Sequence, residues 1–394
     1  MNILMLLDNE FPPDVRVESE ANSLIKQGHS VTILSYNFSN KPLTEEYKGI
    51  QIVRFNINKQ VAKKALGFIM QLPFYKLIWR FQINKLLKVQ QFDAIHIHDL
   101  PLCINARYIK EKFSLKVVAD LHENYPHLIT AQPFMNSLFA TLFLSKKKWF
   151  QKEKEWLMNV TEIVCVANEM KERIDLLLDH KKSIHVVPNT INFETYLSIQ
   201  KPIPELKNKY ANNFVVMYIG GFNALRGLKY LIQAASLLKD KISNLKVILV
   251  GDGNSMNNLT KLANDLNLSN YIIFEGWQPS NKVKAYIDIA DVCVIPHVKS
   301  TQADNSSPNK LFQYMYSKKP VISSNCKSIE KIIIQEDCGL IFENKNYQDL
   351  ANKILKLYEE PKLKKQLGEN GYEAVINKYN WDTTVNELLN IYSN

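Results

Sequence analysis

One segment in the second half of the chain combines the residue types that bind a phosphate group. It reads Ser306-Ser307-Pro308-Asn309-Lys310-Leu311-Phe312-Gln313-Tyr314-Met315, and Lys318-Lys319-Pro320-Val321-Ile322 follows shortly after. Serine before proline predicts a helix start, because the hydroxyl caps free N–H groups and the fixed φ of proline suits the first turn. The Lys-Lys-Pro sequence ends the helix, and Val-Ile begins a buried strand. The start of such a helix offers free N–H groups and a positive dipole end, so the segment predicts a phosphate site.

Two glycine-rich turns point to the same chemistry. Gly220-Gly221 follows an apolar strand, and Arg226 stands at the start of the next helix. Glycines let the backbone approach a phosphate, and a cation such as Arg226 or Lys310 neutralises its charge. The alternative is a surface arginine at a helix start. Gly251 and Gly253 form a second turn of this kind, which alone is a weak signal.

Polar residues also follow strands in the first half of the chain. His122 comes after the strand ending at Ala119, and His98 ends an earlier strand. Asp14 and Arg16 follow the first strand, where they either pair with each other at a helix start or meet a phosphate. Doubly wound folds place ligands at the carboxyl ends of strands, so these positions are candidates for a site. The alternative for each histidine is a core or loop role.

Short apolar strands alternate with helices throughout, which predicts two parallel, doubly wound sheets. A chain of 394 residues is also too long for one ordinary domain. Pro188-Asn189 closes the first half, so we expect domains at 1–189 and 190–379. The expected strands are Ile3–Leu7, Ser30–Leu34, Ile50–Phe55, Ala94–Ile97, Lys116–Ala119, Ile163–Val166, Ile184–Val187, Phe214–Ile219, Lys246–Val250, Ile272–Phe274, Val292–Ile295, Val321–Ser323 and Leu340–Phe342.

The charge distribution suggests a partner surface. The net charge is +10, from 49 basic and 39 acidic residues, and no acidic residue occurs between Glu46 and Asp93. Apolar residues recur there at helical spacing among lysines, which suits a helix lying on anionic lipid. Lys146–Lys148, followed by Trp149, has the same character. The alternative is that both apolar faces are core. We see no nucleic-acid-binding motif.

The remaining composition favours a cytoplasmic protein. No apolar run is long enough to span a bilayer, and the first residues read as a strand instead of a signal peptide. The five cysteines are scattered and lack metal-ligand spacing, which favours reduced, buried thiols.

These motifs together resemble the GT4 type of retaining glycosyltransferases, which have the GT-B fold. Ser307 to Ile322 is similar to the "PNKLFEYMAxGKPVI" variant of the family's nucleotide-sugar site, and Asp120 to Pro126 to its "DxHExyP" motif. The stretch from Asn9 to Glu18 resembles the variant "PPDxRVExEAxxL". The likeness implies two Rossmann-like domains facing a cleft, with a final helix, 380–394, that crosses back to the N-terminal domain.

The resemblance assigns roles to particular residues. It implies that a neutral His122 faces the donor sugar and that Trp277 borders the base. On the acceptor side it suggests Asp14, Arg16, His98 and Glu123. The donor-binding residues that it suggests are Gly220, Gly221, Arg226, Gly251, Gly253, Trp277, Ser307, Asn309, Lys310, Leu311 and Gln313.

The sequence departs from the family pattern where it commonly has two glutamates. Gln313 stands at the second glutamate, which binds the ribose, and Asn305 at the first, near the donor sugar. Gln313 can still accept and donate a hydrogen bond. Asn305 cannot act as a carboxylate, but Asp304 beside it offers one. Gly221 occupies the family's first basic position.

The resemblance implies transfer of a sugar from a nucleotide diphosphate sugar to a glycan or lipid-linked acceptor, with retention. It implies no metal and no further cofactor, because the leaving diphosphate can accept the acceptor's proton. Two rivals stay open. One is another GT-B enzyme, such as a UDP-sugar epimerase or a phosphorylase-like enzyme. The other is a GT-B module that has lost catalysis and binds a partner or glycan, for which Asn305 and Gln313 are the support.

Overall fold

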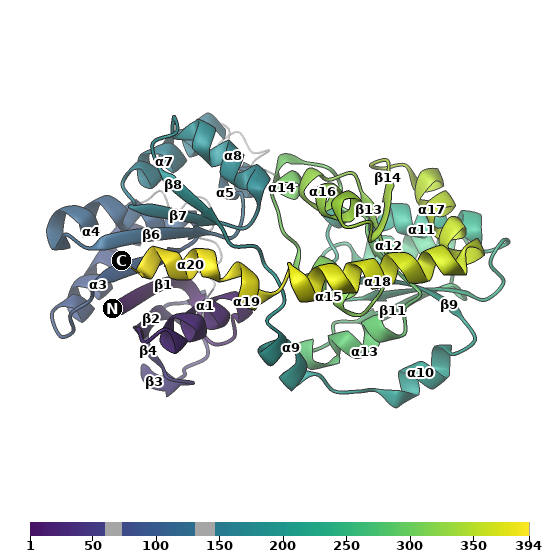
Figure 1. Cartoon of the computed structure of the whole chain (residues 1–394), viewed down its shortest axis with the longest axis horizontal. Helices are drawn as coiled ribbons and strands as arrows, with labels where there is room; N and C mark the ends of the chain where they lie inside the picture. The colour runs from purple at the N-terminus through teal and green to yellow at the C-terminus, as the bar shows by residue number, and fades with distance from the viewer. Residues whose placement is uncertain (60–72, 131–145, 394) are drawn as a thin grey trace. The chain divides into compact units, whose positions relative to one another are not determined.

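The chain forms two compact units, each built on its own sheet (Figure 1). The computed structural model describes residues 1–59, 73–130 and 146–393. Unit 1 comprises Met1–Pro188 and Val385–Asn394, and unit 2 comprises Asn189–Thr384. The final segment of the chain therefore belongs to unit 1.

Unit 1 contains an eight-stranded sheet in the order β3-β4-β2-β1-β5-β6-β7-β8. All neighbouring strands are parallel except β3 and β4. β1 lies between β2 and β5, so the connections leave it in opposite directions and create a topological switch point between β1 and β5. The strands are β1 Asn2–Glu10, β2 Ser30–Asn37, β3 Thr44–Tyr47, β4 Ile50–Asn56, β5 Ala94–His98, β6 Lys116–Leu121, β7 Glu162–Cys165 and β8 Ser183–Val186.

Helices connect the parallel strands of unit 1. The last helix, α20 (Asn386–Tyr392), packs against α1 and β8 (Figure 1). The others are α1 Val15–Lys26, α3 Pro73–Leu87, α4 Ala106–Phe113, α5 Tyr125–Thr130, α7 Lys146–Met158 and α8 Asn168–Leu177, with a 3-10 helix at Leu100–Asn105.

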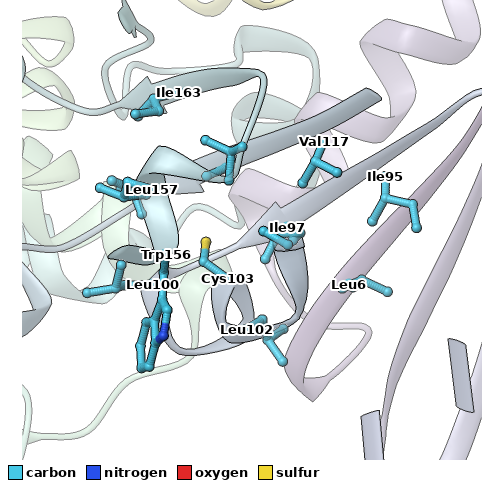
Figure 2. Close-up of a cluster of buried hydrophobic side chains, with 14 of the residues drawn as sticks. Leu6, Ile95, Ile97, Leu100, Leu102, Cys103, Val117, Trp156, Leu157 and Ile163 are labelled. Carbon is cyan, nitrogen blue, oxygen red and sulfur yellow. The ribbon is translucent and has the colours of Figure 1, made fainter. Parts of the chain in front are cut away.

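The core of unit 1 fills one face of the central strands. Figure 2 shows Leu6 of β1 and Ile97 of β5 on this face, together with Cys103. Trp156 and Leu157 of α7 pack into the same cluster. Parallel strands covered by helices are apolar nearly throughout, which is why the sequence signal for them is strong.

The two lysine-rich segments, one between Glu46 and Asp93 and the other at Lys146–Lys148, differ in the burial of their apolar side chains. Trp149 and Trp156 of α7 are buried, so the apolar face next to Lys146–Lys148 is core. On α3 the side chains split into two faces. Tyr75, Trp79, Ile83 and Leu86 are buried, whereas Phe74, Leu77, Ile78 and Phe81 are exposed. Lys63 and Lys64 lie outside the described residues.

Unit 2 contains a six-stranded parallel sheet in the order β11-β10-β9-β12-β13-β14. This is the Rossmann order, and its switch point lies between β9 and β12. The strands are β9 Phe214–Ile219, β10 Leu245–Val250, β11 Ile272–Gly276, β12 Val292–Ile295, β13 Val321–Ser324 and β14 Gly339–Phe342.

Helices surround this second sheet as well. A short 3-10 helix, Ala224–Arg226, precedes α11. Ile191 pairs with Asn380, which ties the beginning of the unit to its end. The helices are α9 Phe193–Ile199, α10 Pro204–Tyr210, α11 Leu228–Leu238, α12 Met256–Asp265, α13 Val283–Asp288, α14 Thr301–Asp304, α15 Asn309–Tyr316, α16 Lys327–Gln335, α17 Tyr347–Glu359, α18 Pro361–Asn377 and α19 Trp381–Thr384.

All five cysteines are buried free thiols. Among the described residues, no helix combines the length and the apolar character that crossing a bilayer requires.

Candidate active site

The carboxyl ends of β1, β5 and β6 bring Asp8, Asp99 and His122 to one edge of the unit 1 sheet. β1 and β5 pair at Leu6 and Ile97, so Asp8 and Asp99 each lie two residues beyond this pair. The backbone N–H of His122 donates to Asp99 Oδ1 at 3.2 Å. The side chains of His122 and Asp99 are 16% and 29% exposed, so both reach solvent. Because this edge includes the switch point, it is the candidate site of unit 1.

Beneath this edge lies a buried group of charged side chains around Asp120. Arg16 Nη2 donates to Asp120 Oδ1 at 2.8 Å, and Arg16 Nε donates to Oδ2 at 3.2 Å. Arg16 Nη1 also donates to the carbonyl of Val187 at 2.9 Å. Glu20 Oε1 lies 3.0 Å from Arg16 Nε. A bidentate guanidinium–carboxylate pair fixes orientation as well as distance, so it holds α1 against β6.

Two neutral histidines complete the buried group. His98 Nδ1 lies 3.4 Å from Asp120 Oδ2 and 3.3 Å from His122 Nε2. Burial lowers the pKa of His98 to about 3. Burial also lowers the pKa of His96, whose Nδ1 lies 2.7 Å from the hydroxyl of Tyr392 in α20. The C-terminal helix thus reaches the same polar group as the first helix.

The surroundings of His122 favour a charged imidazole, whereas the family resemblance implied a neutral one. Its Nε2 donates to Asp120 Oδ2 at 2.6 Å. Burial alone would lower the pKa of His122, but the carboxylates of Asp120 and Asp99 raise it to about 10. Burial alone would raise the pKa of Asp120, yet Arg16 and His122 hold it well below its usual range. The pair is therefore an imidazolium against a carboxylate at neutral pH.

The other acceptor-side residues take different positions from those expected. Arg16 and His98 do not line the edge, because their side chains are 9% and 0% exposed and support Asp120 from below. Asp14 caps α1, since its Oδ1 accepts from the backbone N–H groups of Arg16 and Val17 at 3.1 Å each. Glu123 is exposed next to His122.

The buried group also contains the donor types of a metal site. One possible ligand atom from each of four residues lies within 4.8 Å of the others, and these residues are Glu20, His96, His98 and Asp120. Arg16 already lies against both carboxylates, and a second cation there would meet its charge almost at contact. The group fits a guanidinium better than a divalent ion. The expectation of a metal-free reaction stays a prediction.

In unit 2, glycines shape the turns after β9 and β10. Gly220 and Gly251 both have φ +140°, and an added Cβ would collide with Lys310 Nζ at the first and with the Gly220 carbonyl at the second. Gly253 packs in the same way against the backbone of Phe222. Gly221 has open space around it. The backbone conformation and the close packing therefore require glycine at three of these positions and not at Gly221.

Arg226, His297 and Lys310 converge at the switch point of unit 2. Arg226 Nη1 donates to His297 Nε2 at 3.2 Å, and His297 follows β12. Lys310 Nζ lies over the ring of Tyr218, 4.1 Å from its centroid. Burial and the nearby cations lower the pKa values of His297 and Lys310 well below their usual range.

No described carboxylate forms an ion pair with Arg226 or Lys310. Two cations that repel each other in a desolvated place are costly unless an anion joins them. A ligand with negative charge would therefore relieve the repulsion. This cluster is the candidate anion site of the chain, and the sequence motifs predicted two of its members.

The first turn of α15 places the remaining donor-side residues. Gln313 lies one turn after Lys310 and is half-buried, whereas Asn309 is exposed. Ser307 Oγ is buried and has no partner among the described residues. The side chain of Leu311 is buried and its N–H donates to the Pro308 carbonyl, so Leu311 packs in the core and does not face a ligand.

Asp304 and Asn305 lie just before α15. Asp304 Oδ1 accepts from the backbone N–H of Lys327 at 2.9 Å, so this carboxylate holds the start of α16. Asn305 Nδ2 donates to the Thr301 carbonyl at 2.7 Å, and its Oδ1 is buried without a partner. Trp277 follows β11 and is 71% exposed, which excludes a core role and leaves its ring able to stack on a base.

Sequence reasoning missed several residues of both edges. Tyr218 and His297 are single polar residues outside the motifs. Glu20 and His96 were also assigned no role from the sequence, although each has a residue of its own type two positions away. The signal that could have found two of them is topological. Tyr218 and His297 fall at the carboxyl ends of the strands that flank the unit 2 switch point.

Comparison with family models identifies both halves of the chain. Residues 14–195 match the model described as Glycosyltransferase Family 4, and residues 200–374 match the model described as Glycosyl transferases group 1. Among curated proteins, the chain is similar to the capsular polysaccharide biosynthesis glycosyltransferase CapM of Staphylococcus aureus. The two are 21% identical over 336 residues, covering 78% of this chain and 87% of CapM.

Solved structures confirm the GT-B fold. Sucrose-phosphate synthase from Thermosynechococcus elongatus superimposes with a TM-score of 0.79 at 17% identity, covering 99% of this chain and 98% of that chain. HepE of Anabaena in complex with UDP superimposes with a TM-score of 0.68 at 15% identity over the whole of both chains.

Replacing Arg16 by methionine should destabilise the protein strongly. The change leaves the buried carboxylate of Asp120 without the guanidinium of Arg16. Breaking a buried ion pair in this way costs about 3–5 kcal/mol. The measurement is the free energy of unfolding by urea. Lys154→Met serves as the control, because it breaks an exposed pair with Asp179 and should cost less than about 1 kcal/mol. Equal effects of the two variants would contradict a supporting role for Arg16.

Proposed function

The chain belongs to the GT4-type group 1 glycosyltransferases, and we propose that it transfers a sugar with retention from a nucleotide diphosphate sugar to a glycan or lipid-linked acceptor. The observation that carries the proposal is the unpaired cationic cluster of Arg226 and Lys310 beside the glycine turn of unit 2. The similarity to CapM supports a place in the assembly of a bacterial surface polysaccharide. The UDP in the structure of HepE makes UDP a suitable first probe.

In the proposed reaction, the donor diphosphate lies against Arg226 and Lys310. The acceptor oxygen bonds to the anomeric carbon on the face from which the phosphate leaves, and the electron pair of the broken C–O bond stays on the diphosphate. The acceptor's proton passes to a phosphate oxygen. The protein then has to supply position and positive charge, which two fixed cations and the start of α15 provide. We propose that no metal ion is needed.

The missing glutamates fit this mechanism. Gln313 is half-buried on the face of α15 that carries Lys310, where its amide can bond to the ribose hydroxyls. Asn305 keeps a buried Oδ1 free to accept a bond from a sugar hydroxyl. Neither position has to take up a proton. A non-catalytic module would also bind a nucleotide here, but it would not turn the donor over.

Alanine at Arg226 or Lys310 should weaken nucleotide binding. Each variant loses a charge-assisted bond worth about 2–3 kcal/mol, equivalent to about 30- to 150-fold in affinity. Titration calorimetry with UDP in EDTA measures this affinity and also tests the metal-free proposal. Lys229→Ala is the matched control, because Lys229 is exposed on α11 and lies over Tyr230. Unchanged affinity in both cluster variants would refute the anion site.

His122 should act in transfer and not in folding. His122→Ala should lower turnover by far more than it lowers stability, and His180→Ala, which removes an exposed histidine, should change neither. Because the imidazolium persists until its pKa of about 10, wild-type turnover should hold at neutral pH and fall as the pH rises through about 10. A rise in turnover through about pH 6.5 would instead indicate a neutral imidazole.

We also propose that α3 docks on an anionic membrane surface. Its exposed face carries Phe74, Leu77, Ile78 and Phe81, an apolar stripe at helical spacing. Lys76, Lys85 and Lys88 flank it, and no acidic residue occurs between Glu46 and Asp93. Apolar side chains with lysines beside them suit the headgroup region of anionic lipid.

Replacing Phe74 and Phe81 by serine should weaken binding to phosphatidylglycerol vesicles by more than about tenfold, because both rings lose their burial in lipid. Co-sedimentation measures the binding, which should also fall as salt rises. Ile334→Ser is the control, since it removes an equally exposed apolar side chain from α16. Equal binding to phosphatidylcholine vesicles at low salt would overturn the membrane proposal.

A further inference from the structure

Asp8 is the third polar residue at the unit 1 edge, and the family motifs give it no role. It lies at the carboxyl end of β1, beside the switch point, and is partly exposed. The hydroxyl of Tyr75 in α3 donates to Asp8 Oδ2 at 3.2 Å. Over 1–59, 73–130 and 146–393, no cation lies within ion-pair distance of this carboxylate. Buried carboxylates are usually paired with a cation, whereas this one bonds, among these residues, only to Tyr75 and to its own backbone N–H.

The groups around Asp8 shift its pKa in both directions. Burial and the nearby carboxylate of Asp99 raise the pKa of Asp8 to about 7, although the bond from Tyr75 and the charge of His122 act in the opposite direction. Tyr36 and Tyr125 also face Asp8, and burial together with its charge raises their own pKa values. These neighbours come from β2, α3, α5 and the ends of β5 and β6.

We propose that Asp8 binds the acceptor by accepting a hydrogen bond from a hydroxyl of the acceptor sugar other than the one that becomes glycosylated, whose proton passes to the diphosphate. The inference rests on the proposed transferase function and names a residue that orients the acceptor. Three facts carry it. Asp8 stands at the switch point where ligands of such sheets bind, the residue is partly exposed, and its carboxylate bonds to Tyr75 and to its own backbone N–H but to no cation among the described residues. A sugar hydroxyl is the donor that such a carboxylate can take.

Tyr75 sets the orientation of this carboxylate. Its ring is buried in α3, and its hydroxyl reaches Asp8 from the side opposite the exposed face of the helix. Trp79 Nε1 donates to the hydroxyl of Tyr36 at 3.0 Å, which places a second polar tyrosine in the same buried layer. Tyr75 is thus a positioning residue, and Asp8 is the group that touches the acceptor.

The test uses n-octyl β-D-glucopyranoside as an acceptor mimic with the full-length protein. Calorimetry across neutral pH should show binding that strengthens as the pH rises through about 7, because the carboxylate is the accepting form. Asp8→Asn should weaken binding by about tenfold or more and remove its pH dependence. Asp93→Asn is the control, since it removes the same charge from an exposed residue at the opposite end of β1.

Tyr75→Phe separates this role from a structural one. It keeps the buried ring but removes the hydroxyl that stabilises the carboxylate, so the midpoint of the pH dependence should move to higher pH. A loss of packing alone would not move it. Absence of glucoside binding by the wild type, equal binding by Asp8→Asn, or an unmoved midpoint in Tyr75→Phe would overturn the inference. UDP affinity, measured on the same proteins, distinguishes these outcomes from failure of the proposed transferase function.

Discussion

The buried negative charge of Asp120 is the constraint around which unit 1 is organised. A carboxylate with no exposed surface needs compensation, and it receives it from Arg16 on one side and His122 on the other. One consequence is geometric, because the bidentate bond from Arg16 fixes the first helix against the middle of the sheet. The other is chemical, because the same charge keeps His122 protonated. Burial and Asp120 also raise the pKa of Glu20 well above its usual range.

Unit 2 also has a sheet with a switch point beside its first strand, but the balance of charge there differs from that in unit 1. At the unit 1 switch point, carboxylates face an imidazolium, so charge is nearly balanced. At the unit 2 switch point, Arg226 bonds to His297, whose pKa is lowered by burial and by the charges of Lys310 and Arg226. Balanced charge suits a neutral ligand such as a sugar hydroxyl, whereas unbalanced positive charge suits a diphosphate. The same fold thus carries two different binding chemistries.

Much of the fold could be predicted from the sequence, because parallel strands covered on both faces leave apolar runs. Phe214–Ile219 and Val292–Ile295 were predicted with the bounds that the structure has. Thr44–Tyr47 was missed, since Thr-Glu-Glu-Tyr at a sheet edge has no apolar run to mark it.

The candidate site was less predictable, for a physical reason. A motif places His122 after a strand and two residues after Asp120, but Asp99, which also raises its pKa, is brought to it by the pairing of β5 with β6. Arg16 was expected either to pair with Asp14 at a helix start or to meet a phosphate, because charged residues usually are exposed. Its burial depends on Asp120, which lies 104 positions away in the sequence. Local patterns contain no information about such pairs.

Periodicity alone could not decide whether α3 was core or lipid-facing, and the structure shows that the helix is apolar on both faces. The inner face holds Tyr75 and Trp79, and the outer face holds Phe74 and Phe81. The bond from Tyr75 to Asp8 is 3.2 Å long, which is longer than the roughly 2.5–3.0 Å usual between two oxygen atoms. A shift of α3 by about half an ångström would therefore change this bond substantially. One helix thus carries both the residue that bonds to Asp8 and the exposed apolar face that we propose docks on lipid.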